Sequence, residues 1–352
     1  MRKNNKNKSK TVILYIVALV LFLIVFLVSI SVGSVGISLS DMMTLLKDLI
    51  SGVNEKADVP EGLSAILFNV RMPRVVLAAM VGAALSIAGA AMQGLLKNPL
   101  AEGSTLGITS GGALGAVLSI TLGIQMPLFE QLSLAITSIV FSFFSIVLIL
   151  SLTYKIDKGL STQTIILTGV IFSMFTSSLT SLLVTLKGDS LKQVVFWSMG
   201  SFSGRGWSHV KLMFPFFIAG TIILLTLSHE LNAFSLGEEQ ARYIGVNTKK
   251  IKLFILAIVS VLVGISVSVS GTIGFVGLVV PHITRLIVGP NFKKLLPFSV
   301  LFGSSFLMLT DLVSRTVLSP VELPIGVVTS FIGAFLFIYI FYNHSNKKSK
   351  AV

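Results

Sequence analysis

Long apolar segments recur along the whole chain, and several exceed the roughly 20 residues that a helix needs to cross a bilayer. Hydrophobic residues make up 53% of the 352 residues, and charged residues only 12%. Soluble domains carry about 25% charged residues, so a soluble fold of this length could not bury so much apolar surface. The sequence therefore predicts an all-α protein that crosses a membrane several times.

Ten segments have the length and composition of membrane-spanning helices. They cover residues 11–32, 66–92, 104–122, 128–153, 162–186, 208–228, 252–272, 274–289, 295–311 and 324–342, with ends defined to a few residues. The apolar run that follows the basic N-terminus continues to about Val32 without a convincing cleavage site, which favours a retained span over a signal peptide. We expect residues 1–352 to form one transmembrane domain.

The basic residues predict the orientation. With the N-terminus inside, eighteen of the 27 lysines and arginines fall in inward segments and nine in outward ones. Cytoplasmic loops of membrane proteins carry this excess of positive charge. Both termini are therefore expected in the cytoplasm, including a basic tail at 1–10 and a second tail at 343–352. An even number of spans agrees with this.

Two outward segments have helical patterns. Residues 38–50 begin with a Ser–Asp cap and place Met42, Leu45, Leu46 and Leu49 on one face, which predicts a helix at the outer surface. Residues 188–204 predict a second outward helix followed by a Gly/Ser turn.

Small residues form a stripe on the second span. Ala78, Gly82, Ser86, Ala90 and Gly94 recur at every fourth position, and Gly107, Gly111 and Gly115 repeat that spacing on the third span. Such stripes let helix backbones approach closely in lipid. We interpret them as packing within one subunit; a seam between subunits is the alternative.

Several kinds of chemistry have no motif in this sequence. There is no phosphate-binding loop, no His-Glu-x-x-His, no serine nucleophile elbow and no cysteine, and the four histidines are scattered. We therefore predict no enzymatic activity, no catalytic or metal-binding residues and no cofactor. Asp311 and Glu130 fall at predicted span ends, which disfavours a proton relay and an ion-coupled carrier. Energy for transport should come from another subunit.

The longest inward segment is 229–252, HELNAFSLGEEQARYIGVNTKKIK. It is polar and contains helix formers, and glycine interrupts it at positions 237 and 245. By itself it predicts a pair of short helices at the inner surface, available to a soluble partner.

The pattern Leu-Gly-Glu-Glu-x-Ala-x-x-x-Gly in this segment resembles the coupling segment of ABC importer permeases. Five further blocks appear in the same order as in the FecCD-type permeases for iron siderophores, haem and cobalamin. These blocks are RMPR (71–74), VGAALSIAGAAMQGLLKNPLAEGSTLGITSGGALGA (81–116), IILTGV (165–170), GTIGFVGLVVPHITRLIVGP (271–290) and ELPIGVVTSFIGAFLF (322–337). Together the six blocks extend from about Arg71 to Phe337.

The resemblance implies a cobalamin-permease-like ABC importer fold in a bacterial cytoplasmic membrane. It also implies a second permease subunit (a second copy or a sister chain), cytoplasmic ATP-binding subunits and an extracytoplasmic substrate-binding protein. The implied mechanism is ATP-driven alternating access, with a ferric siderophore complex as the expected cargo. Haem or cobalamin is the alternative cargo.

The resemblance also assigns roles to individual residues. Arg71, Arg74 and Arg315 match arginines that dock the binding protein; the alternative is that they extend to lipid headgroups. The expected coupling residues are Gly237, Glu238, Glu239, Ala241, Arg242 and Gly245. Asn98, Leu100, Ser161 and Thr162 match positions near a cytoplasmic gate, although ordinary turn chemistry also explains them. Met92, Phe172 and Met174 are weak candidates for the cargo path, and we expect them in the packed core.

Overall fold

The computed structural model describes residues 2–33, 36, 38–51, 62–127 and 132–349, and in these residues every regular element is a helix. Seven helical segments are long and apolar enough to cross a membrane, and three apolar helices are shorter. The long ones lie in α1 (Arg2–Ser31), α3–η2–α4 (Leu63–Leu95), α6 (Ser133–Ile156), α7 (Thr162–Leu186), α9 (Trp207–Thr226), α12 (Thr248–Ser270) and α14 (Phe292–Thr316). The short ones are α5 (Ile108–Leu122), α13 (Val276–Val288) and the apolar part of α15 (Ile325–Ser349).

The ten predicted spans correspond one by one to these ten segments. One difference is in α14, which continues to Thr316, whereas the sequence placed its end near residue 311. Asp311 and Arg315 therefore lie in the last two turns of this helix, and Asp311 is near a span end as expected. Glu130, the other carboxylate considered there, lies outside the described residues.

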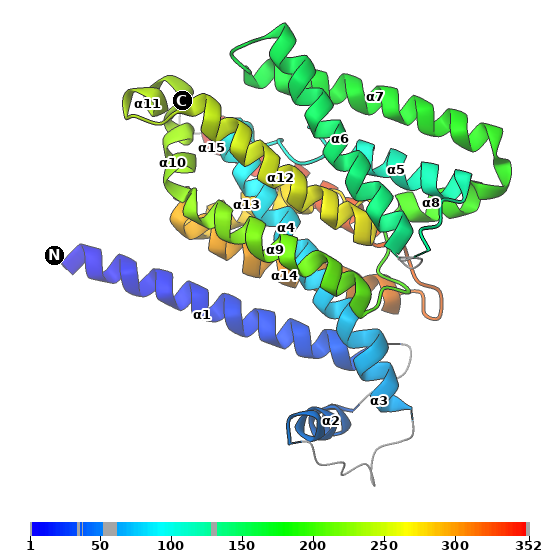
Figure 1. The fold of residues 1–352 in the computed structure, drawn as a ribbon. Helices are drawn as coiled ribbons and strands as arrows, with labels where there is room; N and C mark the ends of the chain where they lie inside the picture. The colour runs from blue at the N-terminus through cyan, green and yellow to red at the C-terminus, as the bar shows by residue number, and fades with distance from the viewer. Residues whose placement is uncertain (1, 34–35, 37, 52–61, 128–131, 350–352) are drawn as a thin grey trace.

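Helix α4 (Met72–Leu95) occupies the centre of the bundle and packs against α14, α13, α12 and α9 (Figure 1). The small residues permit this because a methyl group at Gly82 would overlap the backbone of Gly303, and one at Gly89 would overlap Gly277. In the same way α5 packs on α6, where Gly111 lies against Ser145. The predicted close packing within one subunit is confirmed.

The two ends of the bundle carry different short helices. At one end, α2 (Leu39–Ser51) is capped by Ser38 and buries Met42 and Leu45, and α8 (Leu191–Ser198) follows the turn η4 (Gly188–Ser190). At the other end lie α10 (Ser228–Leu236) and α11 (Glu238–Tyr243), on the same side as the start of α1 and the end of α15 (Figure 1). Both outward helices and the inward pair are confirmed as helices.

Two non-helical segments enter the bundle. Residues 96–107 join α4 to α5, and within them Gly103 packs against Val263 of α12. Val263 lies about 22 Å along α12 from Thr248, at about 1.5 Å per residue. Residues 271–275 join α12 to α13 inside the bundle. Non-helical backbone at membrane depth is tolerated where protein buries it or where it lines a cavity.

Candidate functional site

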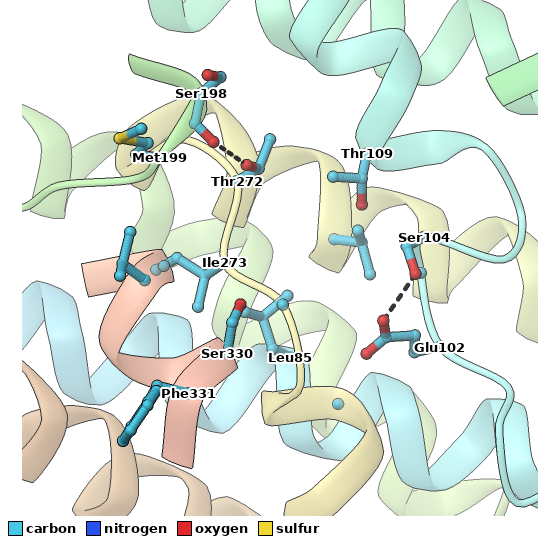
Figure 2. A pocket seen from close by; sticks show the side chains of 16 residues that line it. Leu85, Glu102, Ser104, Thr109, Ser198, Met199, Thr272, Ile273, Ser330 and Phe331 are labelled. Atoms are coloured by element: carbon cyan, nitrogen blue, oxygen red, sulfur yellow. Dashed lines mark hydrogen bonds between the residues drawn. The ribbon is translucent and has the colours of Figure 1, made fainter. Parts of the chain in front are cut away.

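A cavity of about 620 Å³ lies where these two segments meet the starts of α5, α13 and α15. Ser104 and Thr109 line one side, and Ile273, Ser330 and Phe331 line the other (Figure 2). Ser198 and Met199 close the third side, where Thr272 donates a hydrogen bond to the Ser198 carbonyl. The lining thus combines hydroxyl groups, glycine backbone and apolar side chains.

Glu102 contributes a carboxylate to this cavity. Its Oε1 accepts a hydrogen bond of 2.7 Å from Ser104, and Thr105 Oγ1 donates to its backbone carbonyl at 2.6 Å. Its Cβ lies next to Gly277, which packs on α4 at Leu85. A charge at this depth costs about 2.5–3.5 kcal/mol on insertion scales, so such residues usually mark a functional path. The sequence analysis missed Glu102 because it lies between two predicted spans.

A second cavity, of about 550 Å³, lies along α7 and shares the lining residue Ser104 with the first. Its α7 wall includes Ser173, Met174, Ser177 and Ser178. Met174 is 66% exposed, so the expectation that it belongs to the packed core is wrong. Met92 is in the core as expected, and Phe172 is partly buried. The sequence alone did not distinguish these positions.

At the outer end, Arg74 and Arg315 turn inward. Arg74 pairs with Asp311 at 2.9 Å and with Glu322 at 2.7 Å, and Arg315 approaches Asp311 at 3.4 Å. Arg71 is also buried and donates to the carbonyls of Ile30 and Ser31, at 3.1 and 2.7 Å. In this chain all three guanidinium groups therefore contact protein groups, and docking of the binding protein stays a prediction. The sequence did not predict that Arg74 would pair with Asp311 and Glu322, which are 237 and 248 residues away along the chain.

At the inner end, glycine separates the two short helices from each other and from α12. Gly237, between α10 and α11, has φ +137°, and Gly245, after α11, has φ +92°. A residue with a side chain is strained at such backbone angles, which explains why glycine occupies both positions. Asn232 of α10 accepts a hydrogen bond from the backbone N–H of Phe292, at 2.9 Å, so the pair is attached to the start of α14.

Lys252 connects this inner pair to the bundle. Its Nζ donates to Glu238 Oε2 at 2.6 Å and to the Leu160 carbonyl at 2.9 Å, and its side chain is buried. One side chain therefore joins α11, α12 and the loop between α6 and α7. The sequence analysis gave Lys252 no role beyond orientation, because a lysine near a span start is common.

The surface of α11 differs from the predicted set of coupling residues. Ala241 is buried and Glu238 pairs with Lys252, whereas Glu239 and Arg242 are exposed. Beside them two side chains that the prediction omitted project from the end of the helix: Tyr243 is 88% exposed and Ile244 is 65% exposed. An exposed apolar pair among charged residues is typical of a contact surface for another protein.

The four predicted gate residues lie in two separate turns. Asn98 Oδ1 accepts from the backbone N–H of Leu100 at 2.9 Å, and Ser161 caps α7 while Thr162 begins it. Hydrogen bonds from Ser161, through its side chain and its backbone, and from the Gly159 backbone lower the pKa of Asp157 to about 2. These contacts are turn chemistry, and the gate role stays a prediction.

Comparison with known proteins identifies related chains. The sequence model of the FecCD transport family matches residues 21–343. An uncharacterized ABC transporter permease protein of Bacillus subtilis is 50% identical over 275 residues, which cover 78% of each chain. A cobalamin import permease of Halobacterium salinarum is 38% identical, over 80% of this chain and 74% of the relative. An Fe(3+)-citrate import permease of B. subtilis is 32% identical, over 97% of this chain and 98% of the relative.

A solved structure described as an inward-facing metal-chelate type ABC transporter has a similar fold. It superimposes with a TM-score of 0.82 at 33% sequence identity, covering 94% of this chain and 99% of that one. The similarity includes the ten-helix bundle as a whole, and not only the motif blocks.

Proposed function

This chain belongs to the FecCD transport family of ABC importer permeases, and on that premise we propose that it carries a ferric siderophore complex into the cytoplasm by ATP-driven alternating access. It is a multi-pass membrane protein, and the ATP-hydrolysing site of such importers is in separate subunits. The proposal concerns the cargo, the partners and the residues that serve them.

The cavity beside Glu102 is the observation that supports a chelate as cargo. Its volume of about 620 Å³ is far more than a bare metal ion needs. Hydroxyl groups, glycine backbone and side chains such as Met199 and Phe331 give weak contacts to a bulky organic ligand. Weak contacts suit transport, because a site that binds too tightly does not release.

The exposed face of α7 supports a second permease subunit across the cavity. Only 22% of the most apolar 18-residue stretch of α7 is buried in this chain, and Ser177, Ser178 and Ser181 are exposed on this helix. Small polar side chains are typical of helix contacts within membranes. The second cavity borders this face and shares Ser104 with the first, so a second copy or a sister chain would complete the cargo path.

The inner helix pair is the proposed contact for the ATP-binding subunits. Glu239, Arg242, Tyr243 and Ile244 would touch the partner, while Glu238 and Ala241 would hold the helix in place. Gly237 and Gly245 permit the turns on either side. Asn98, Leu100, Ser161 and Thr162 would form the gate, and Lys252 connects the second of these loops to α11 through the Leu160 carbonyl.

Docking of the binding protein is proposed at the outer end, where Arg71, Arg74 and Arg315 lie. Carboxylates of the binding protein would have to compete with Asp311 and Glu322 for the guanidinium groups. Glu322 is the easier one to displace, because its side chain is 37% exposed, whereas Asp311 is buried.

Uptake in cells tests the cargo. Cells that lack this chain should lose ATP-dependent uptake of a radiolabelled ferric hydroxamate, and the wild-type chain should restore it. Restored uptake of haem or cobalamin, with no effect on ferric hydroxamates or catecholates, would contradict the siderophore assignment and support the alternative cargo.

A further inference from the structure

Glu102 is the one ionisable side chain among the described residues that line the cavity of Figure 2. The other lining residues offer hydroxyl groups, backbone groups or apolar surface. Lys97 and Arg285, which are basic, line a different cavity near the inner end, beside Ser235 and Phe292. The charge of the cavity wall is therefore decided by one carboxylate.

The N-termini of three helices surround the same cavity, and their partial positive charges offset the negative charge of that carboxylate. Thr109 lies in the first turn of α5, Gly277 in that of α13 and Gly326 in that of α15. A helix N-terminus carries roughly half a positive charge. The N–H of Gly326 already donates to the Met199 carbonyl at 2.9 Å. The positive potential in the cavity therefore comes mainly from the N-termini of α5 and α13. Two such starts contribute roughly one positive charge, which a single carboxylate offsets.

The carboxylate is held in a fixed position. Ser104 Oγ donates to Glu102 Oε1 at 2.7 Å, and Thr105 accepts a hydrogen bond from the Glu102 N–H at 3.3 Å. Figure 2 shows Glu102 on the opposite side of the space from Ser330 and Phe331. A cargo in the cavity would meet this negative charge before it reached the inner end.

We infer that Glu102 sets the charge class of the cargo, so that the cavity admits neutral or cationic metal chelates and rejects anionic ones. The inference rests on the proposed function, and it narrows the siderophore class. Hydroxamate groups bind Fe³⁺ to give neutral or cationic complexes, whereas carboxylate-rich chelates and haem are anionic. Without the carboxylate, the helix starts would make the cavity attractive to anions.

Cysteine labelling tests the charge of the cavity without any cargo. The chain contains no cysteine, so Ser330→Cys introduces a single thiol into the cavity wall. In membranes that contain the full chain, a cationic and an anionic thiosulfonate reagent should react with a rate ratio that favours the cation. Glu102→Gln, which has the same size, should shift this ratio towards the anion by about tenfold or more. Glu102→Asp should retain most of the preference.

Two controls make the labelling result decisive. Asp189→Asn removes an exposed carboxylate outside the cavity and should leave the ratio unchanged. A neutral thiosulfonate should label Ser330→Cys at the same rate with and without Glu102→Gln if that substitution preserves the fold. Cation-to-anion ratios that do not change with Glu102→Gln, or no reaction of Ser330→Cys alone with any reagent, would overturn the inference.

Uptake of matched chelates separates the inference from the proposed cargo. Linear ferric trihydroxamates with a terminal ammonium, acetamide or succinamate group differ mainly in charge. At saturating loaded binding protein, we expect the cationic and neutral complexes to enter faster than the anionic one, and Glu102→Gln to reduce the difference. If none enters although labelling shows the expected ratio, the cargo assignment fails and the role of Glu102 stands. Entry of the anionic complex at the rate of the cationic one would overturn that role.

Discussion

Asp311 accepts a hydrogen bond of 2.9 Å from Arg74, although 237 residues separate them along the chain, and its carboxylate is only 1% exposed. Arg315, one turn further along α14, approaches the same carboxylate. This cluster fixes the start of α4 against the end of α14. Because ionised groups inside a membrane protein need partners, the two arginines depend on Asp311.

Asp311→Asn should therefore destabilise the protein. Removal of one member of a buried ion pair leaves an uncompensated charge, and the expected loss is about 3–5 kcal/mol. Thermal unfolding of the detergent-solubilised chain would measure it. Glu322→Gln is the matched control and should cost at most about 1 kcal/mol, because that carboxylate is partly exposed. Equal stabilities of the two variants would contradict this account of the cluster.

Glu322→Gln also tests docking through Arg74. If carboxylates of the binding protein pair with Arg74, removal of its exposed competitor should strengthen binding about two- to fivefold at low salt. The gain should shrink as ionic strength rises, because exposed charges are screened. Titration of the permease in nanodiscs with the binding protein measures both effects. Weaker or unchanged binding at low salt would argue against docking at Arg74.

Lys252→Met tests whether the buried lysine transmits movement from α11 to the bundle. We expect uptake per ATP hydrolysed to fall about fivefold or more, because Glu238 and the Leu160 carbonyl lose their common partner. Lys250→Met, which removes an exposed lysine two residues away, is the control. Parallel measurements of ATP hydrolysis and uptake in proteoliposomes distinguish the two. Full coupling in Lys252→Met would rule out this role.

A double variant with Tyr243→Ala and Ile244→Ala should assemble with the ATP-binding subunits about tenfold or more weakly. Both side chains are exposed, and exposed aromatic anchors often dominate such interfaces. Co-purification from membranes measures the assembly. Phe143→Ala removes another exposed aromatic side chain, from the membrane-spanning helix α6, and it should have no effect. Normal assembly of the double variant would place the contact elsewhere.

Helix positions were predictable because hydropathy acts locally. All ten spans, the close packing at the small-residue stripe of α4 and the helix pair interrupted by Gly237 and Gly245 follow from composition and spacing. The resemblance to the FecCD family is likewise confirmed. The spans, the stripe and the helix pair each depend on residues close together in the sequence, whereas the resemblance rests on ordered blocks from Arg71 to Phe337.

Long-range pairing and membrane depth were not predictable. Arg74 meets Asp311 only because two distant helices pack side by side, and no local pattern encodes that. Glu102 lies deep in the bundle because residues 96–107 fold back against α12, although their composition is that of an ordinary loop. The burial of Ala241 and the exposure of Tyr243 likewise depend on how α11 sits on the bundle.

The central claim is transport of a metal chelate at the expense of ATP, and reconstituted transport tests it most directly. Proteoliposomes that contain the permease and its ATP-binding subunits, with loaded binding protein outside and ATP inside, should accumulate a radiolabelled neutral ferric hydroxamate. They should accumulate none with a non-hydrolysable ATP analogue. Accumulation that follows an imposed ion gradient and ignores ATP would contradict the account.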